Sequence, residues 1–153
     1  MITEQLKLVK IHENTHLIDS CIQILNEEWP RESGNRMKTM KRSSDNFPIC
    51  LALINGHEKV LGFVKLTSEK PFNPVIFVES LVVRKDCRGK GIGRFIMEQV
   101  ERIGKELNFT KIHLTTIDQQ GFYCKLGYYN VSPKMNICIN HNGNNKILMC
   151  KNI

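Results

Sequence analysis

Apolar positions recur along this chain with two different periods, and the two kinds of segment are interleaved. Continuous or alternating apolar runs predict strands over residues 6–11, 49–54, 60–66, 75–83, 111–116, 128–131, 135–139 and 147–150. Apolar residues at helical spacing predict helices over residues 15–29, 37–41 and 95–107 and around 123. Strands and helices that follow each other in this way indicate a mixed α/β fold.

Turn-forming residues separate these segments. Asn55-Gly56 predicts a hairpin turn between two strands, and Asn142-Gly143 separates the last two predicted strands. Prolines at 71 and 74 mark a loop before the strand at 75–83. Asn14 or Thr15 is expected to cap the first helix, because short polar side chains accept hydrogen bonds from the first helical N–H groups.

A glycine-rich segment, Arg88-Gly89-Lys90-Gly91-Ile92-Gly93-Arg94, connects the strand at 75–83 to the long helix. The start of a helix offers N–H groups without acceptors and the positive end of the helix dipole, which suit a pyrophosphate. Glycines help because a phosphate reaches these amides only where no Cβ blocks its approach. The segment therefore predicts a phosphate-binding loop, and a solvated basic turn is the alternative.

Two common phosphate-binding loops do not fit this segment. A dinucleotide fold places its glycines after the first strand, whereas these glycines lie past the middle of a short chain. A nucleotide-hydrolase loop ends in Gly-Lys-Ser/Thr, and the sequence contains no such tripeptide. The pattern that remains is Arg/Gln-x-x-Gly-x-Gly, filled here by Arg88, Gly91 and Gly93.

This pattern resembles the pyrophosphate loop of the GCN5-related acetyltransferase superfamily, whose members bind acetyl-coenzyme A. A second motif, Phe-Tyr-Cys-Lys-Leu-Gly-Tyr at 122–128, is similar to the superfamily's Phe-Tyr-x-x-x-Gly-Phe/Tyr. Aromatic core residues and a helix-ending glycine would leave the same pattern. Because both motifs occur in the right order, the chain is identified as a member of the superfamily. The resemblance implies one domain over 1–153, with a mixed sheet of about seven strands, flanking helices and a splay between strands 4 and 5.

The composition is ordinary for a soluble globular protein, and together with the features below it predicts a cytosolic location. Apolar residues make up 41% and charged residues 24% of the 153 residues. No apolar run approaches the roughly 20 residues that span a bilayer, and the N-terminus lacks a signal-peptide core. The six cysteines form no Cys-x-x-Cys pair, so no metal site is expected.

The net charge of +7 and the pI near 9.2 predict an anionic partner. The phosphates of coenzyme A account for part of this charge. Nucleic acid is the usual alternative for a small basic protein, but the basic residues are dispersed and no nucleic-acid-binding motif accompanies them. We therefore expect neither a nucleic-acid nor a membrane partner.

The superfamily resemblance assigns roles to residues around the thioester. It implies that the main chain of Leu81, Val82 and Val83 holds the pantetheine and the acetyl oxygen. It also implies that Tyr123 lies beside the sulfur and protonates the departing thiolate, with simple hydrogen bonding to the sulfur as the weaker alternative. Transfer is expected to be direct, within a ternary complex.

The acceptor amine must lose a proton, and several residues are candidates for this step. Glu79 interrupts an apolar strand and resembles the glutamate that some superfamily members use as general base; a structural salt bridge is the alternative. His113 and Thr115 share one face of the fifth strand, and Asp118 follows it. His113 is either a proton relay or a core histidine.

Segments at 26–31, 43–48, 79–83 and 113–119 resemble the actin-type N-terminal acetyltransferases. The resemblance implies an acidic processed N-terminus, with actin as the expected substrate. An α-amino group has a pKa of about 7.7–8.0 against about 10.4 for lysine, so a modest base suffices. The candidate substrate-binding residues are Trp29, Arg36, Lys38, Arg42, Ser43, His113, Thr115 and Asp118, and a solvated basic face is the alternative reading of the cations among them.

One feature of that group is absent here. Better-known members carry a proline-rich stretch that recruits profilin, whereas this chain has five prolines and no cluster of them. Docking on profilin is therefore not expected. Acetylation of protein lysines, acetylation of a small-molecule amine, and non-catalytic binding of acyl-CoA stay open as alternative functions.

Overall fold

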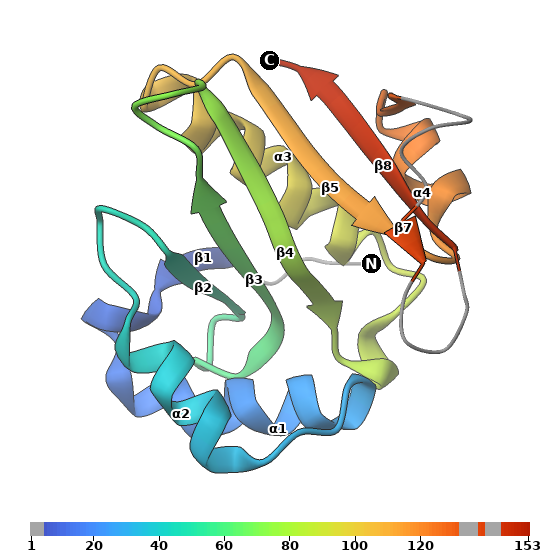
Figure 1. Cartoon of the computed structure of the whole chain (residues 1–153). Helices are drawn as coiled ribbons and strands as arrows, with labels where there is room; N and C mark the ends of the chain where they lie inside the picture. Colours follow the sequence, from blue (N-terminus) through green and yellow to red (C-terminus); the bar gives the residue numbers. More distant parts are fainter. Residues whose placement is uncertain (1–4, 132–137, 140–144) are drawn as a thin grey trace. The chain divides into compact units, whose positions relative to one another are not determined.

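The structure is a computed structural model that describes residues 5–131, 138–139 and 145–153 (Figure 1). The chain forms two compact units. Unit 1 comprises Met1–Thr67 and Ser80–Val100, and unit 2 comprises Ser68–Glu79 and Glu101–Ile153. Strand β4 (Val75–Val83) and helix α3 (Ile92–Glu106) each contribute residues to both units.

Unit 1 contains an antiparallel ladder of β1 (Lys7–Lys10), β2 (Ile49–Ile54) and β3 (Val60–Ser68). Every residue of β2 is buried, which explains why its sequence is continuously apolar rather than alternating. These three strands confirm the predictions from the apolar runs.

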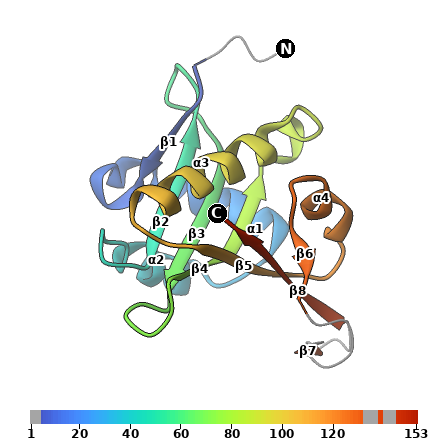
Figure 2. The same cartoon turned by 90° about the horizontal axis from the view of Figure 1, so that it is seen from above.

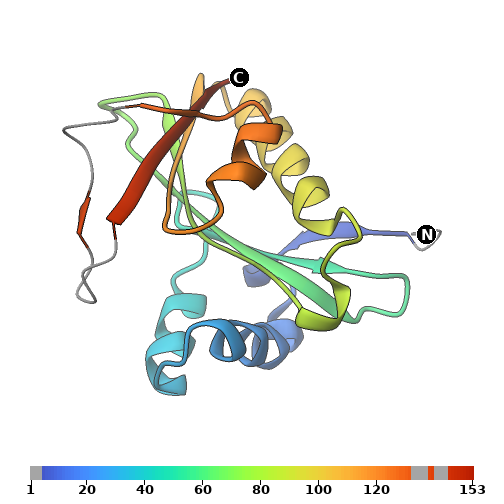
Figure 3. The same ribbon diagram turned by 90° about the vertical axis from the view of Figure 1, so that its right-hand side faces the viewer.

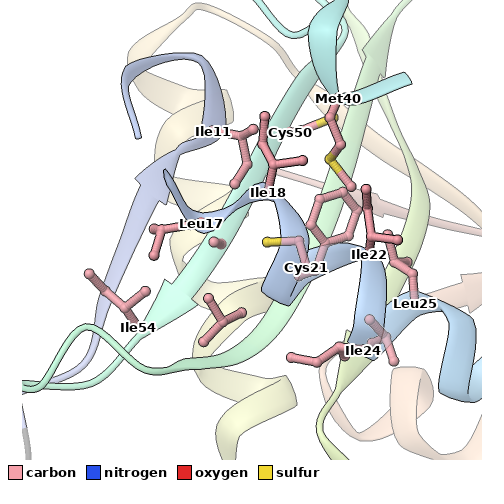
Figure 4. Packing of buried hydrophobic residues seen from close by; sticks show 14 residues of the cluster. Ile11, Leu17, Ile18, Cys21, Ile22, Ile24, Leu25, Met40, Cys50 and Ile54 are labelled. Carbon is pink, nitrogen blue, oxygen red and sulfur yellow. The ribbon is translucent and has the colours of Figure 1, made fainter. Parts of the chain in front are cut away.

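Helices α1 (Ile18–Glu28) and α2 (Ser33–Lys41) lie on one side of this ladder, and the first turns of α3 lie on the other (Figure 3). Figure 4 shows the α1 side chains packed with Met40 and Cys50. On the α3 side, a Cβ at Gly62 would come within 2.9 Å of Ile96 Cδ1 and 3.0 Å of the Val82 carbonyl. The absence of a side chain at this glycine lets α3 approach the strand closely.

The start of α1 differs from the expectation. Two 3₁₀ turns, η1 (Ile11–Glu13) and η2 (Thr15–Leu17), precede the helix, and the residue before its first turn, Leu17, caps nothing with its side chain. The Asn14 side chain instead donates to the Lys10 carbonyl at 2.9 Å. The predicted cap at Asn14 or Thr15 was therefore wrong, because the amide stabilises the preceding turn.

The hairpin between β2 and β3 is confirmed, but its turn is longer than a two-residue loop. The Asn55 N–H donates to the Lys59 carbonyl at 3.1 Å. The Asn55 side-chain oxygen accepts the N–H groups of His57 and Lys59, each at 3.0 Å. Glu58 has a φ of 57°, so the left-handed residue follows Gly56 instead of coinciding with it.

Unit 2 contains the only parallel strand pair recorded among the described residues. β4 pairs with β5 (Lys111–Thr116) from Val75↔Lys111 to Val78↔Leu114 (Figure 1). β4 then continues to Val83, in agreement with the expected splay between the fourth and fifth strands. The order in this unit is β4-β5-β8-β6, with β8 (Asn145–Asn152) antiparallel to β5.

The end of the chain completes unit 2. Helix α4 (Gln120–Lys125) lies beside β6 (Tyr129–Asn130) and β8 (Figure 2). The two-residue strand β7 (Cys138–Ile139) pairs with β8 off the main order. The predicted strand residues 135–137 and the predicted turn at 142–143 lie outside the described residues.

The described residues form eight strands with one parallel pair, and together with the flanking helices they confirm the predicted mixed α/β class. Across the described residues, each helix is too short or too polar to cross a membrane.

Candidate active site

The glycine-rich loop adopts the conformation that its sequence requires. After β4 comes the 3₁₀ turn η3 (Lys85–Cys87), and then Gly89 and Gly91 take φ values of 76° and 80°. Glycine adopts this left-handed region without strain. A Cβ added to either glycine would meet no heavy atom within 4 Å, apart from the adjacent residues. The requirement for glycine at these two positions therefore comes from the backbone conformation and not from crowding.

The loop leads directly into α3 and presents its N-terminal amides. The first helical hydrogen bond runs from the Phe95 N–H to the Gly91 carbonyl at 3.0 Å. The N–H groups before Phe95 therefore point out of the helix end. The first turn of α3 carries no acidic residue, so this end attracts an anion without repulsion from its own side chains. These residues fit a pyrophosphate.

Two arginines flank the loop, and each already has an anionic partner. Arg84 binds Asp86 through two hydrogen bonds of 2.6 and 2.5 Å, which hold the pKa of this carboxyl well below its usual range. Arg88 donates from Nη2 to Glu28 Oε2 at 2.7 Å and from Nε to the Val83 carbonyl at 2.9 Å. Because Arg88 and Glu28 are both partly exposed, this pair remains accessible to solvent.

The three predicted main-chain contacts lie at the end of β4. Val82 is buried in the core of unit 1, whereas Leu81 and Val83 are half-buried. Just after them, the Arg84 N–H donates to the Leu61 carbonyl at 2.8 Å. The end of β4 is thus anchored to β3 within unit 1.

In unit 2, Tyr123 is buried on α4, with its ring edge-on to Phe122 and Tyr128 at centroid distances of 5.0 and 5.8 Å. Burial raises the pKa of Tyr123 to about 12, so the phenol stays neutral. Full proton transfer to a thiolate whose thiol pKa is about 8.5 would cost about 5 kcal/mol. The buried hydroxyl is therefore better suited to donating a hydrogen bond than to complete protonation.

The aromatic motif also has a structural role. Gly127 has a φ of 94° and its N–H donates to the Cys124 carbonyl at 3.0 Å, which ends α4. Gly127 thus matches the structural alternative of a helix-ending glycine, and Tyr123 and Tyr128 are core aromatics.

Three candidate residues share one face of the β4–β5 pair. Phe77 is opposite His113 in the parallel register, with the rings 5.4 Å apart, so Glu79 and Thr115 continue the same face two residues later. Glu79 lies in an apolar strand, where burial of its carboxylate would be unfavourable. Its side chain is exposed to solvent, so this desolvation cost does not arise. Asp118, just beyond β5, is also exposed.

His113 has the protonation state that a proton acceptor needs. Partial burial, and to a lesser extent Lys111, lower the pKa of His113, while Glu69 opposes this shift. The imidazole is therefore neutral near pH 7. His113 and Thr115 lie on β5 and Glu79 follows the last residue of β4 that pairs with β5, so all three stay candidates for the acceptor site.

Arg36, a candidate for substrate binding, is buried in unit 1. Its Nε donates to Asn26 Oδ1 at 3.1 Å and its Nη2 donates to the Trp29 carbonyl. Burial lowers the pKa of Arg36, and the nearby Arg31 adds to this effect. Arg36 therefore supports the connection between α1 and α2, whereas Lys38 and Arg42 are exposed.

Ser43 is also occupied within unit 1. Its hydroxyl contacts His12 Nδ1 at 2.8 Å and accepts the Cys50 N–H at 2.9 Å. His12 Nε2 in turn lies 3.0 Å from Asp45 Oδ1. This network joins the residues after α2 to β2, so Ser43 has a structural role.

Trp29 remains a candidate for an apolar wall because 43% of the residue's surface is exposed. Sequence reasoning missed Glu28 as an individual residue. A carboxylate at the last position of a helix is unfavourable next to the helix C-terminus, and this signal could have indicated a cationic partner.

Ligand atoms of His12, Glu13 and Asp45 lie within 4.8 Å of one another, a spacing that suits a metal ion. However, Lys10 Nζ lies 2.7 Å from Asp45 Oδ1. Its ammonium, followed by His12, holds the pKa of Asp45 below the usual range. Because this carboxylate already has a cation, the group is a poor metal site.

A groove of about 530 Å³ opens between α1 and α2. It is lined by Asp19, Ile22, Gln23, Asn26, Glu27, Ser33 and Met37. Two of these residues are acidic and none is basic, so the groove does not suit an anionic ligand.

Comparison with known proteins decides the family. Residues 15–128 match the family described as Acetyltransferase (GNAT) family. The chain belongs to the GNAT acetyltransferase family. This family assignment confirms the resemblance drawn from the glycine-rich loop and the aromatic motif.

Among GNAT relatives, the chain is 35% identical over 123 residues to mouse (Mus musculus) N-alpha-acetyltransferase 80. The match covers 76% of this chain and 39% of the mouse protein, so the chain spans well under half of that relative's length. It is also 29% identical over 126 residues to the uncharacterized N-acetyltransferase ycf52 of Pyropia yezoensis, covering 80% of this chain and 66% of that protein.

A solved structure shows the same fold. The aminoglycoside 6'-N-acetyltransferase complexed with coenzyme A superposes with a TM-score of 0.79 at 18% identity. The match covers 95% of this chain and 96% of that one. This GNAT neighbour binds coenzyme A, which is consistent with the glycine-rich loop described above.

The burial of Arg36 predicts a stability effect. Replacing Arg36 with Ala removes the side-chain donor to the Trp29 carbonyl and one of the two donors to Asn26 Oδ1, which keeps the Arg31 N–H, so we expect a loss of about 1–3 kcal/mol in the free energy of unfolding. Urea denaturation measures this loss. Lys38→Ala, which removes an exposed cation from the same helix, should change stability by less than about 0.5 kcal/mol. Equal effects of both changes would contradict the supporting role of Arg36.

Proposed function

We propose that this GNAT protein transfers the acetyl group of acetyl-CoA to the α-amino group of acidic protein N-termini in the cytosol, with mature actin as the expected acceptor. The observation that carries this proposal is the set of exposed cations in residues 31–42, which follow the exposed Trp29 in the chain. The 35% identity to mouse N-alpha-acetyltransferase 80 supports it.

The loop residues 88–94 would hold the pyrophosphate through their backbone N–H groups, with Arg88 adding charge. Leu81, Val82 and Val83 would supply backbone contacts to the pantetheine arm. Acetyl-CoA brings the reactive thioester, and the protein supplies position and proton control. The described fit of the loop to a phosphate supports this assignment.

The acceptor amine must be neutral before it attacks. A substantial fraction of an α-amino group is already neutral near pH 7, because its pKa is about 7.7–8.0. After the neutral amine attacks the thioester, its nitrogen must lose a further proton to form the amide. We assign removal of this proton to neutral His113 or to Glu79, directly or through water. Tyr123 would donate a hydrogen bond to the sulfur as negative charge develops there.

Recognition of an acidic N-terminus needs cations near the amine. Residues 31–42 carry five basic side chains and one acidic side chain, Glu32. Arg31, Lys38 and Arg42 are exposed and able to meet carboxylates, whereas buried Arg36 would hold the segment in place. Docking on profilin and binding to nucleic acid or membranes are not part of this proposal.

Substrate choice is tested with peptides beginning Asp-Asp-Asp, Met-Leu and Ser-Gly, and with an N-terminally blocked lysine peptide. We expect the Asp-Asp-Asp peptide to have the highest kcat/KM, because the exposed cations compensate its carboxylates. Preference for the blocked lysine peptide would instead make the protein a lysine acetyltransferase. Absence of turnover with every peptide would favour a binding module.

The same assay tests the basic segment. Arg42→Gln should raise the KM for the Asp-Asp-Asp peptide about two- to fivefold and leave the KM for the Ser-Gly peptide unchanged, as expected for an exposed charge contact. Arg102→Gln is a matched control, since Arg102 is an exposed arginine on α3 near Glu106. Equal KM changes for both peptides would remove Arg42 from the recognition surface.

The proposed role of Tyr123 predicts a separation of rate from affinity. Tyr123→Phe should lower kcat at least tenfold, since the hydrogen bond to the sulfur is lost, and leave the Kd for coenzyme A within twofold. Steady-state kinetics and calorimetry measure the two quantities. A parallel loss of kcat and affinity would show that the hydroxyl acts through packing. A kcat that stays at the wild-type value would exclude the hydroxyl from the reaction.

A further inference from the structure

The arginine of the glycine-rich motif is bound to the end of another helix. Arg88 Nη2 lies 2.7 Å from Glu28 Oε2, and Glu28 is the last residue of α1. The Nε of the same guanidinium donates to the Val83 carbonyl at 2.9 Å. All three residues belong to unit 1, so the contact lies within one compact body.

The electrostatics of α1 explain why Glu28 recruits this arginine. The C-terminal end of a helix carries partial negative charge, and a carboxylate placed there adds to it. The last turn of α1 contains no basic residue. Arg88 therefore brings positive charge from the cofactor loop to this helix end, in addition to Arg36, which donates to the Trp29 carbonyl.

In the Arg88–Glu28 ion pair, another anion can readily replace the Glu28 carboxylate. The side chains of Arg88 and Glu28 are 44% and 34% exposed, and exposed ion pairs contribute little to stability. A pyrophosphate presents several anionic oxygens in a geometry that a guanidinium binds well. The loop amides that suit a pyrophosphate begin at the residue after Arg88, so Glu28 and the phosphates would draw on the same guanidinium.

We infer that Glu28 competes with the pyrophosphate of acetyl-CoA for the Arg88 guanidinium, so that cofactor binding releases the end of α1. This inference rests on the proposed function, because it requires coenzyme A to bind at the loop. It makes Glu28 a positioning residue that acts through Arg88.

Release of Glu28 affects the segment proposed to bind the acceptor. Trp29 directly follows Glu28, and its carbonyl accepts a hydrogen bond from Arg36. The end of α1 is thus held by one arginine from the cofactor loop and one from α2. When Arg88 leaves Glu28, this side-chain contact between the loop and the helix end is lost, whereas the bond from Arg36 stays. Binding of the cofactor would therefore change the contacts that hold Trp29 in position before the acceptor binds.

Calorimetry of coenzyme A binding at low ionic strength tests the competition. Glu28→Gln should bind coenzyme A about two- to fivefold more tightly than the wild type, because the competing carboxylate is gone. Glu27→Gln is the matched control: it removes the same charge from the adjacent, exposed position, and its affinity should stay within 1.5-fold of the wild type. In an Arg88→Gln background, Glu28→Gln should have no effect.

Unchanged or weaker binding by Glu28→Gln would overturn the inference while leaving the proposed function intact. A tightening that persists in the Arg88→Gln background would also overturn it, since the effect would then bypass Arg88. Failure of the wild type to bind coenzyme A would overturn both the inference and the proposed function.

The link to the acceptor segment has its own readout, because Trp29 is the single tryptophan of the chain. Titration of the wild type with coenzyme A should shift the Trp29 emission, and Glu28→Gln should show less than half of that shift. Calorimetric binding without an emission change in the wild type would overturn the release of the α1 end.

Discussion

The left-handed backbone at Gly89 and Gly91 is the constraint on which the account of this protein depends. It turns the chain from β4 into α3 and leaves the first amides of the helix directed outward. The close approach of α3 to β3 at Gly62 then holds this helix end in place within unit 1. An anion site made of backbone requires this fixed geometry, since no side chain could rebuild it.

Charged groups in unit 1 serve the structure as much as they serve recognition. Arg36 and Ser43 are buried and bonded to neighbouring segments, so they hold α1, α2 and β2 together. The cations of residues 31–42 that are exposed, by contrast, are accessible to the acidic acceptor that we propose. This division follows from burial, since a guanidinium removed from water must keep its partners and cannot also serve a ligand.

The fold was largely predictable because apolar periodicity marks strands and helices directly, as β2 and α3 illustrate. The glycine-rich loop was predictable for a related reason: only glycine adopts its φ values easily. Arg36 shows the limit, since composition suggests an exposed basic face and only tertiary packing shows that its guanidinium is buried. Asn14 shows another limit. Its side chain can bond either to the turn before it or to the helix after it, and the sequence does not indicate that it bonds to the Lys10 carbonyl.

Binding of the acetyl-CoA pyrophosphate by the residues before α3 can be observed by NMR on protein labelled with ¹⁵N-glycine. Coenzyme A is titrated into the wild type while the amide signals of its ten glycines are followed. We expect the amide signals of Gly89, Gly91 and Gly93 to shift most, because their N–H groups gain phosphate acceptors, and those of Gly34 and Gly56 to stay in place. Saturation with coenzyme A that leaves the three loop glycines unmoved would contradict the account.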